Sequence, residues 1–327
     1  MTKAPDRSAR AATLHTLAPT ARTVHGHFSR ELPPVLTIAP GDTVRFTTLD
    51  AGWGVVESPD PFAPAPRFPG RDRQRDPGHA LCGPVAIEGA RAGDTLEVRI
   101  LSVRTGRWGW SSAGGFPSPV NDALGLSDPP ESSLRWRLDP DAGRAESDRG
   151  HVLAMRPFLG VLGMPPEAPG WHSTIPPRPC GGNIDCRELV AGSRLFLPIA
   201  VDHALFSAGD GHALQGDGEV AGPALECPME AVDLEFQLHR GGAPEWPRAE
   251  TPAGWVTLGF DPDLDRAMLI ALDQMLKLIA GRLGVDRREA LMLSSMLVQL
   301  RISQIVNGTR GVHALLPTEA LRALGLA

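Results

Sequence analysis

The chain has 327 residues, of which 42% are hydrophobic, and its formal net charge is −6 at pH 7. That length allows one large domain or two smaller ones, and the mild negative charge, without a basic cluster, argues against nucleic acid as the main partner. The sequence holds neither an apolar run of about 18 residues nor a signal-peptide core, so we expect no membrane partner, no secretion and a cytoplasmic location.

An alternating unit recurs through the first two thirds of the chain. Residues 35–46 and 85–100 each hold an apolar segment, a Gly-Asp turn and a second alternating segment, and residues 189–197 form a weaker copy. Alternation around a glycine turn is typical of β-hairpins, in which Asp42 and Asp94 are turn residues. With glycine and proline spread along the chain, these units predict a mainly β (α+β) fold of packed antiparallel sheets, a sandwich or small barrel.

The C-terminal part has helical periodicity instead. Apolar residues predict a helix over 265–283, and Asp286 with Glu289 resembles a capping box that starts a second helix running to about Val306. This pair is expected to pack on the sheets or on a neighbouring subunit. The predicted organisation is a flexible N-terminal segment (1–22), a β-rich catalytic core (23–255) and a C-terminal helical element (256–327).

Two polar stretches, 58–78 and 139–150, lack apolar periodicity and are expected to be surface loops. The first lies between Asp50 and His79, so it is either a lid over a site or, more simply, a solvated insertion. Asp50 and His79 each stand next to a predicted strand, where β folds place binding residues. A capping aspartate and a structural histidine are the ordinary interpretations of such positions.

Polar groups are concentrated between Gly181 and Glu226. Carboxylates this close repel one another, and a buried unpaired charge is costly, so we expect a bound divalent cation among them. The four cysteines form no Cys-x-x-Cys pair and are interpreted as free, mostly buried thiols. The polar residues that flank the apolar run 195–201 are Asn183, Asp185, Asp210, His212, Gln215, Asp217 and Glu219.

Taken together, these motifs resemble the acetamidase/formamidase family of amide hydrolases. The most specific are Gly-Gly-Asn-x-Asp at 181–185 and Gly-Asp-Gly-His-Ala-x-Gln-Gly-Asp-Gly-Glu at 209–219, whereas Gly-Asp-Thr alone is common. The resemblance extends from about His25 to the C-terminal part. The other segments that carry it are 33–37, 41–44, 49–51, 83–85, 88–90, 93–94, 157–163, 173–177 and 301–307.

The resemblance implies a metal-dependent hydrolase of short non-peptide amides, such as formamide or acetamide, that is mainly β and homo-oligomeric, a dimer or tetramer. Residues 54–78 and 106–128 depart from the family pattern and are expected to shape substrate entry. The residues implied as metal ligands are Asp50, His79, Asp185, Asp210 and His212, with Glu219 as the acid/base and Asn183 and Gln215 as polar partners in catalysis.

Amide hydrolysis needs an activated water, a stabilised oxyanion and a proton for the leaving nitrogen. A divalent cation lowers the pKa of water to about 7; mixed Asp/His ligation suits Zn²⁺, and the excess of carboxylates suits Ca²⁺ at a second position. Glu219 is expected to take the proton of the water and pass it to ammonia. Gly-x-Ser-x-Gly is absent, and Lys3 and Lys277 are the only lysines, which disfavours serine and Cys/Glu/Lys mechanisms.

Two other interpretations stay open. A β-sandwich can bind a metal or a small ligand without turning it over, because fold alone does not establish a reaction. A cupin-type oxygenase would use mostly histidine ligands with one carboxylate, whereas carboxylates outnumber histidines in the key segment. Ammonia release from formamide and acetamide, with and without a chelator, distinguishes the amide hydrolase from the other two, and elemental analysis distinguishes zinc from iron.

Overall fold

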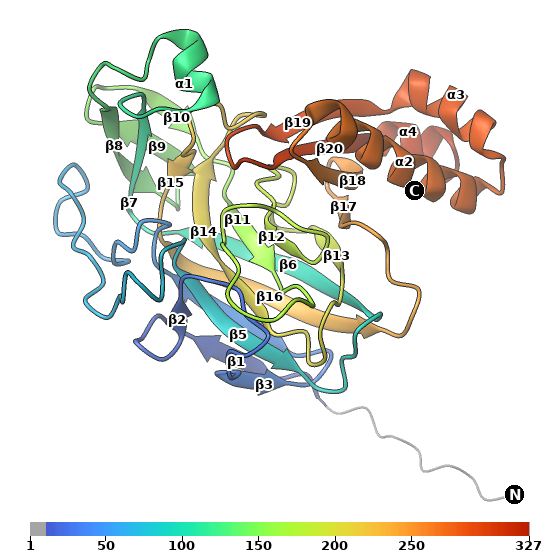
Figure 1. Cartoon of the computed structure of the whole chain (residues 1–327), viewed down its shortest axis with the longest axis horizontal. Coiled ribbons are helices and arrows are strands. Elements are labelled where there is room, and N and C mark those ends of the chain that lie inside the picture. Colours follow the sequence, from blue (N-terminus) through green and yellow to red (C-terminus); the bar gives the residue numbers. More distant parts are fainter. Residues whose placement is uncertain (1–10, 327) are drawn as a thin grey trace, which may run out of the picture.

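Two large β-sheets form the body of the protein. The computed structural model describes residues 11–326, and the mainly β architecture expected from the sequence is confirmed, with helices gathered mostly at the C-terminal end (Figure 1). The first sheet has nine strands, in the spatial order β1 (Leu14–Leu17), β4 (Thr43–Thr48), β16 (Met229–His239), β6 (Thr95–Thr105), β13 (Arg194–Pro198), β17 (Arg248–Thr251), β18 (Gly254–Asp261), β20 (Arg310–Pro317) and β19 (Gln299–Gln304).

The second sheet has eleven strands and carries most of the residues singled out above. Its neighbours pair antiparallel apart from β3 with β5. The main path is β10 (Val152–Ala154), β9 (Arg144–Ser147), β8 (Ser132–Asp139), β7 (Trp108–Ala113), β15 (Leu225–Glu226), β14 (Phe206–Leu214), β11 (Phe158–Gly163) and β12 (Gly181–Asn183), and β5 (Leu81–Ile87) joins β14 to β2 (Val24–His25) and β3 (Leu36–Ile38).

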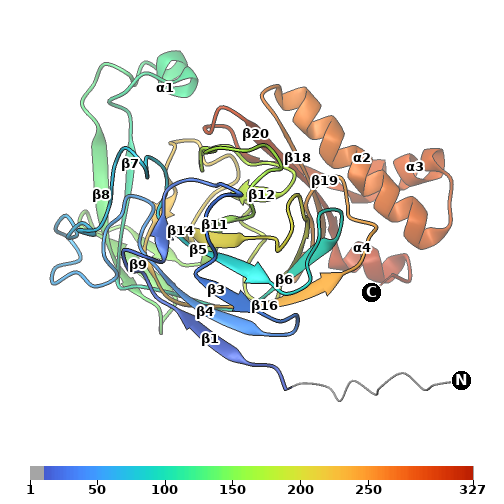
Figure 2. The same ribbon diagram turned by 60° about the horizontal axis from the view of Figure 1, so that its bottom comes forward.

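The two sheets enclose the main hydrophobic core. Figure 2 shows β1, β4 and β16 as one layer and β3, β5 and β14 as the layer above it. Phe206 of β14 reaches across the core, with ring centroids 6.4 Å from Phe46 of β4 and 5.1 Å from Phe236 of β16. All three rings are fully buried. Burial of aromatic side chains from both sheets therefore holds the layers together.

The Gly-Asp turns connect the two sheets, so the hairpin prediction is wrong. β3 pairs with β5 in the second sheet, whereas β4 pairs with β1 and β16 in the first, and β5 and β6 separate in the same way. The weaker copy at 189–197 contains the single strand β13. Strands that face each other across a core alternate as hairpin strands do, so the sequence pattern does not distinguish the two arrangements. Asp42 and Asp94 do close turns, accepting hydrogen bonds from the backbone N–H groups of Ala39 and Arg91.

The C-terminal part combines helices with three strands of the nine-stranded sheet. The first predicted helix is confirmed as α2 (Leu264–Leu283), but the second, α3 (Arg287–Leu297), ends well before Val306, and β19 follows it. The strand forms because Leu300, Ile302 and their neighbours pair along β20, which outweighs the helical spacing. The remaining helices are α1 (Pro119–Leu124) and α4 (Thr318–Ala323). Within residues 11–326, no helix is long and apolar enough to cross a membrane.

Two expectations about irregular segments are corrected as well. The N-terminal segment 1–22 contributes β1, which pairs in parallel with β4; residues 1–10 of that segment lie outside the described residues. The polar stretch 139–150 contains β9, paired with β8 in a hairpin. Residues 58–78 form a loop without a strand, as expected. Cys82, Cys180, Cys186 and Cys227 are free and buried, as the sequence predicted.

A buried carboxylate on β6 makes the stability of the nine-stranded sheet pH-dependent. Glu97 is fully buried and accepts hydrogen bonds from Arg99 (2.7 Å), Arg194 (2.7 Å) and His239 (2.6 Å). Burial by itself would raise the pKa of Glu97, but these three partners outweigh it and lower the pKa from 4.5 to about 2. Because the folded state holds the carboxylate more strongly than the unfolded state, Glu97 stabilises the fold above pH 4.5, and this stabilisation is lost as the pH falls towards 2.

We therefore expect Glu97→Gln to flatten the fall of the melting temperature between pH 4.5 and pH 2. Thermal unfolding followed by circular dichroism across that range measures the slope. Glu146→Gln, which removes an exposed partner of Arg137, is the control and should leave the slope unchanged. A wild-type slope in Glu97→Gln would show that other carboxylates cause the acid sensitivity.

Candidate active site

Three of the predicted site residues converge on one glycine of β11. Asp210 and His212 lie on β14, which pairs with β11, and the backbone N–H of Asp185, just after β12, donates to the carbonyl of Gly160 (3.2 Å). A Cβ atom added to Gly160 would lie 2.5 Å from Asp210 Oδ2, 2.6 Å from Asp185 Oδ1 and 2.9 Å from His212 Cε1. The side chains therefore meet in a space that exists because position 160 has no side chain.

The backbone is strained at the acidic residues. Asp185, Asp210 and Glu219 have φ angles of 47°, 60° and 45°, in the left-handed region. That conformation costs a residue other than glycine on the order of 1–2 kcal/mol, and such strain is concentrated at functional sites. The strain directs all three carboxyl groups inward, where they are almost completely buried.

Two groups of side chains in the described chain have the geometry of a metal site, and both include His212. One joins it to Asp185 and Glu219, the other to Asp210 and Glu226, and within each group the ligand atoms lie within 4.8 Å of one another. His212 Nε2 is 3.5 Å from Asp210 Oδ1 and 3.3 Å from Glu226 Oε1. Glu226, on β15, was not predicted; its signal was a carboxylate inside the apolar run Ala224–Cys227.

Gln215 determines which nitrogen of His212 faces the carboxylates. Its amide NH₂ group donates to the carbonyls of Asp185 (2.9 Å) and Ser303 (3.2 Å), so its Oε1 is the acceptor for His212 Nδ1 at 2.9 Å. Nδ1 therefore carries a proton, and Nε2 is the nitrogen that can bind a cation. Gln215 thus orients a ligand rather than contacting the cation.

The charges in this cluster are balanced by protons when no cation is bound. Burial, and then the nearby Asp210, raises the pKa of Asp185 to about 8. Burial and Asp185 raise the pKa of Glu219 well above its usual value. Burial also disfavours the charged forms of Asp210 and His212, but charged neighbours outweigh it at both residues. His79 and His212 lower the pKa of Asp210 to about 2. Glu226 and Asp210 raise the pKa of His212 well above its usual value.

The cluster also offers acceptor atoms that are left without hydrogen bonds. Among residues 11–326, Asp185 Oδ1, Glu219 Oε2 and Glu226 Oε2 are buried and unpartnered. Orphaned buried carboxylate oxygens are rare unless a ligand satisfies them. One imidazole nitrogen surrounded by several such oxygens fits a divalent cation.

Three other predicted residues surround this cluster without joining it. Asp50 lies outside both groups, and its oxygens accept hydrogen bonds from the Trp110 indole (2.6 Å) and from the backbone N–H of Gly54. His79 lines the cavity above the cluster and contacts Thr174. Asn183, at the end of β12, lines the same cavity with a buried Oδ1 that has no partner in the described chain.

The cavity above the cluster has a volume of about 770 Å³ and a mixed lining. Asn183, Asp210, Glu219 and Glu226 lie on its walls. The two segments expected to shape substrate entry do contribute to it: 54–78 supplies Arg71, Pro77 and Gly78, and 106–128 supplies Trp110, Phe116, Ser118, Pro119 and Val120.

The loop after β19 completes the cavity from the opposite sheet. Asn307 lies on the cavity wall and donates to Asp185 Oδ2 (2.8 Å), and the Gln304 side chain accepts from its backbone N–H (3.1 Å). Backbone hydrogen bonds between Gly218 and both Ser303 and Ile305 tie this strand to the Glu219 loop. Asn307 was not predicted as a site residue, because the second helix was expected to run to about Val306 and no strand was predicted that would bring Asn307 to the cluster.

Comparison with known proteins identifies the family to which the chain belongs. The model of the "Acetamidase/Formamidase family" matches residues 13–169 and 167–253, which include the acidic cluster. The chain belongs to the acetamidase/formamidase family. The crystal structure of an acetamidase from Bacillus halodurans superposes with a TM-score of 0.81 at 28% identity, covering 95% of this chain and 99% of that one. The family resemblance seen in the sequence is thereby confirmed.

Curated family members are similar over a shorter span. An acetamidase of Mycolicibacterium smegmatis is 28% identical over 67% of this chain and 66% of its own length. A formamidase of Methylophilus methylotrophus is 28% identical over 68% of this chain and 66% of its own length. The chain therefore spans about two thirds of these relatives.

The vacant position at Gly160 gives a direct test of the cluster. Gly160→Ala should displace Asp185, Asp210 and His212, because added atoms in a packed interior cost about 1–3 kcal/mol or shift their neighbours. Bound cation, measured by elemental analysis, should fall to a small fraction of the wild-type content. Gly281→Ala, on α2 with no atom within 4 Å of the new Cβ, is the matched control and should keep it. Full cation content in Gly160→Ala would mean that the three side chains do not share a ligand.

Proposed function

We propose that this chain hydrolyses a short linear amide, such as formamide or acetamide, to a carboxylate and ammonia with the help of a divalent cation. The convergence of Asp185, Asp210 and His212 over Gly160 carries this proposal. Two similar proteins are named acetamidase and formamidase, and the cavity beside the cluster has room for a small substrate.

Asp185, Asp210, His212 and Glu226 are the proposed cation ligands. When bound, a divalent cation lowers the pKa of water and polarises a carbonyl group. A histidine nitrogen with carboxylates suits Zn²⁺, and the two groups that share His212 leave room for Ca²⁺ at a second position. The predicted ligands Asp50 and His79 are not included, because neither belongs to these groups.

Glu219 is proposed to move the proton. Its carboxyl group is almost completely buried beside Asp185, and burial with that neighbour raises its pKa well above the usual value. A bound cation would favour the ionised form, and the carboxylate could then act as a general base. Glu219 accepts a proton from the attacking water as the new C–O bond forms, and then delivers it to the amide nitrogen as the C–N bond breaks. The products are a carboxylic acid, which loses its remaining proton to solvent to give the carboxylate, and ammonia, and Glu219 returns to its starting state.

Asn183 is proposed to position the substrate. Asn183 lines the cavity that also holds Glu219, and its buried Oδ1 has no hydrogen-bond donor among the described residues. An amide substrate carries an N–H donor that an ester lacks, so pairing with Oδ1 would favour amides. Gln215 contributes indirectly, by orienting His212.

Glu219→Gln tests the proton transfer. The substitution keeps size and hydrogen-bonding capacity but cannot carry the proton, so kcat for ammonia release should fall on the order of 10²–10⁴-fold while cation content and melting temperature stay near wild type. Glu167→Gln on the surface is the control. The substrates are formamide, acetamide, propionamide, butyramide and benzamide. No ammonia from any of them with cation-loaded wild type would favour a binding protein without turnover.

Removal of the cation tests the ligand set. A ligand that binds the native state but not the unfolded state stabilises the fold by about 2.7 kcal/mol when its free concentration is a hundred times its Kd. A chelator should therefore lower the melting temperature, and Zn²⁺ or Ca²⁺ should restore it. Asp210→Asn should abolish this restoration, and Asp141→Asn, exposed and far from the cluster in the sequence, should not. A chelator-insensitive melting temperature would argue against a structural contribution of the cation.

Assembly and location remain predictions. A homo-oligomer, dimer or tetramer, is supported by the exposed apolar residues Leu291, Met292 and Met296 on α3. The predicted cytoplasmic location is compatible with four free cysteines.

A further inference from the structure

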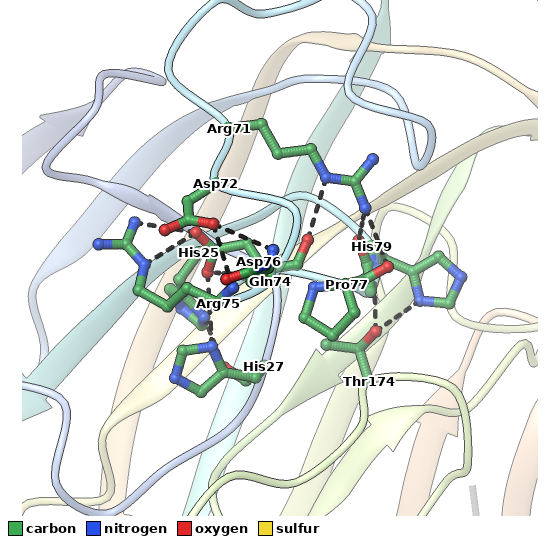
Figure 3. Close-up of polar contacts among 12 residues, drawn as sticks. His25, His27, Arg71, Asp72, Gln74, Arg75, Asp76, Pro77, His79 and Thr174 are labelled. Carbon is green, nitrogen blue, oxygen red and sulfur yellow. Dashed lines mark hydrogen bonds and ion pairs between the residues drawn. The ribbon is translucent and has the colours of Figure 1, made fainter.

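His79 makes an unusual pair of contacts with one buried hydroxyl group. Thr174 Oγ1 accepts a hydrogen bond from the backbone N–H of His79 (2.9 Å) and lies 3.0 Å from Nδ1 of the same residue. Figure 3 shows the imidazole with Nδ1 turned to Thr174 and its other nitrogen directed away. The contact fixes the direction of the ring.

The hydroxyl also determines where the proton of the imidazole lies. Thr174 is fully buried, and among residues 11–326 its hydroxyl has no partner besides the two atoms of His79. Its oxygen accepts from the backbone N–H, so the hydroxyl proton is left for Nδ1, because buried donors are rarely unpaired. With Nδ1 as an acceptor, the proton of His79 is on Nε2.

We propose that His79 is a catalytic hydrogen-bond donor whose Nε2–H stabilises the substrate oxygen as it becomes an oxyanion, and that Thr174 is the positioning residue that holds this tautomer. The inference rests on the proposed function. It replaces the role of metal ligand that the family resemblance implied for His79.

The surroundings of His79 support a donor rather than a ligand. His79 is half-buried on the cavity wall, and within the described chain neither ring nitrogen makes an ion pair with a carboxylate or belongs to a ligand group. It is nevertheless near enough to lower the pKa of Asp210. His212 is the opposite case, since Gln215 accepts from its Nδ1 and leaves Nε2 free to bind a cation.

The segment before His79 is held rigidly, so the donor is in place before the substrate arrives. Arg71 donates to the carbonyls of Asp76 (3.0 Å) and Pro77 (2.9 Å) (Figure 3). The Trp53 indole donates to the carbonyl of Gly78 (2.9 Å). The Arg71 guanidinium lies 4.9 Å from the Trp53 ring centre. Fixed donors stabilise an oxyanion without the cost of reorganisation.

In this step His79 keeps its proton. Addition of water opens the carbonyl π bond and places a negative charge on the substrate oxygen, which Nε2–H then contacts. When the tetrahedral species collapses, the C=O bond re-forms, the C–N bond breaks, and the nitrogen leaves with the proton from Glu219.

Three substitutions of His79 distinguish a donor from a ligand. His79→Ala should lower kcat on the order of 10²–10³-fold, the usual effect of removing one oxyanion donor, with cation content unchanged. The amide N–H of His79→Gln reaches about the position of Nε2, so kcat of this variant should be at least tenfold higher than that of His79→Ala. The amide of His79→Asn reaches the position of Nδ1 instead, so this variant should show no such recovery. His151→Gln, at an exposed histidine, controls for the exchange itself.

The positioning role of Thr174 is tested separately. Thr174→Val should lower kcat with little change in KM, and Thr174→Ser, which keeps the hydroxyl, should restore it. Loss of cation in His79→Ala, or equal activity of the Ala and Gln variants, would overturn the proposal. Absence of ammonia release by the wild type would instead reject the proposed function, and cation content of the His79 variants would still report on the ligand role.

Discussion

The site depends on an excess of buried acid around a single imidazole. Asp185, Asp210, Glu219 and Glu226 are all almost completely buried beside His212. Desolvation and mutual repulsion oppose ionisation of all four, and one imidazolium cannot neutralise them. Raised pKa values at Asp185 and Glu219 show how the protein without a cation responds, by retaining protons. A divalent cation would replace those protons with one compact positive charge.

Residues that hydrogen-bond to the two site histidines give them different chemical roles. Gln215 accepts from His212 and leaves a nitrogen lone pair facing the acids, whereas Thr174 donates to His79, which lines the cavity, and leaves the N–H on the other side of the ring free. Neither assignment follows from the two histidines alone. Hydrogen bonds to the far side of each ring separate a cation ligand from an oxyanion donor.

Local motifs in the sequence predicted much of this site. The glycine-rich segments around Asp185 and Asp210 indicated tight backbone bends with buried acids, and the structure places these residues together over Gly160. The alternating strands likewise predicted the two packed sheets. Both inferences rest on short-range rules, the backbone freedom of glycine and the two-residue period of a strand.

What the sequence could not predict depends on partners far along the chain. Two strands joined by a turn alternate in the same way whether they pair in one sheet or face each other from two sheets. The sequence therefore did not show which sheet β4 and β6 would join. Glu226 resembled an ordinary strand residue until β15 placed it beside His212. Helical spacing continued past Leu297, yet pairing with β20 turned the next segment into β19 and brought Asn307 to Asp185. Tertiary pairing outweighs local preference in each case.

The contribution of β19 has a consequence for biogenesis. Asp185, Asp210 and Glu219 leave the ribosome well before Asn307, which donates to Asp185, and before the Ser303 carbonyl that holds Gln215. Until that distant strand is synthesised, the acidic residues lack the opposing wall of the cavity and the hydrogen bonds that join it to the Glu219 loop. The cavity can therefore be completed only after β19 has been synthesised, and the proposed cation would bind after that step.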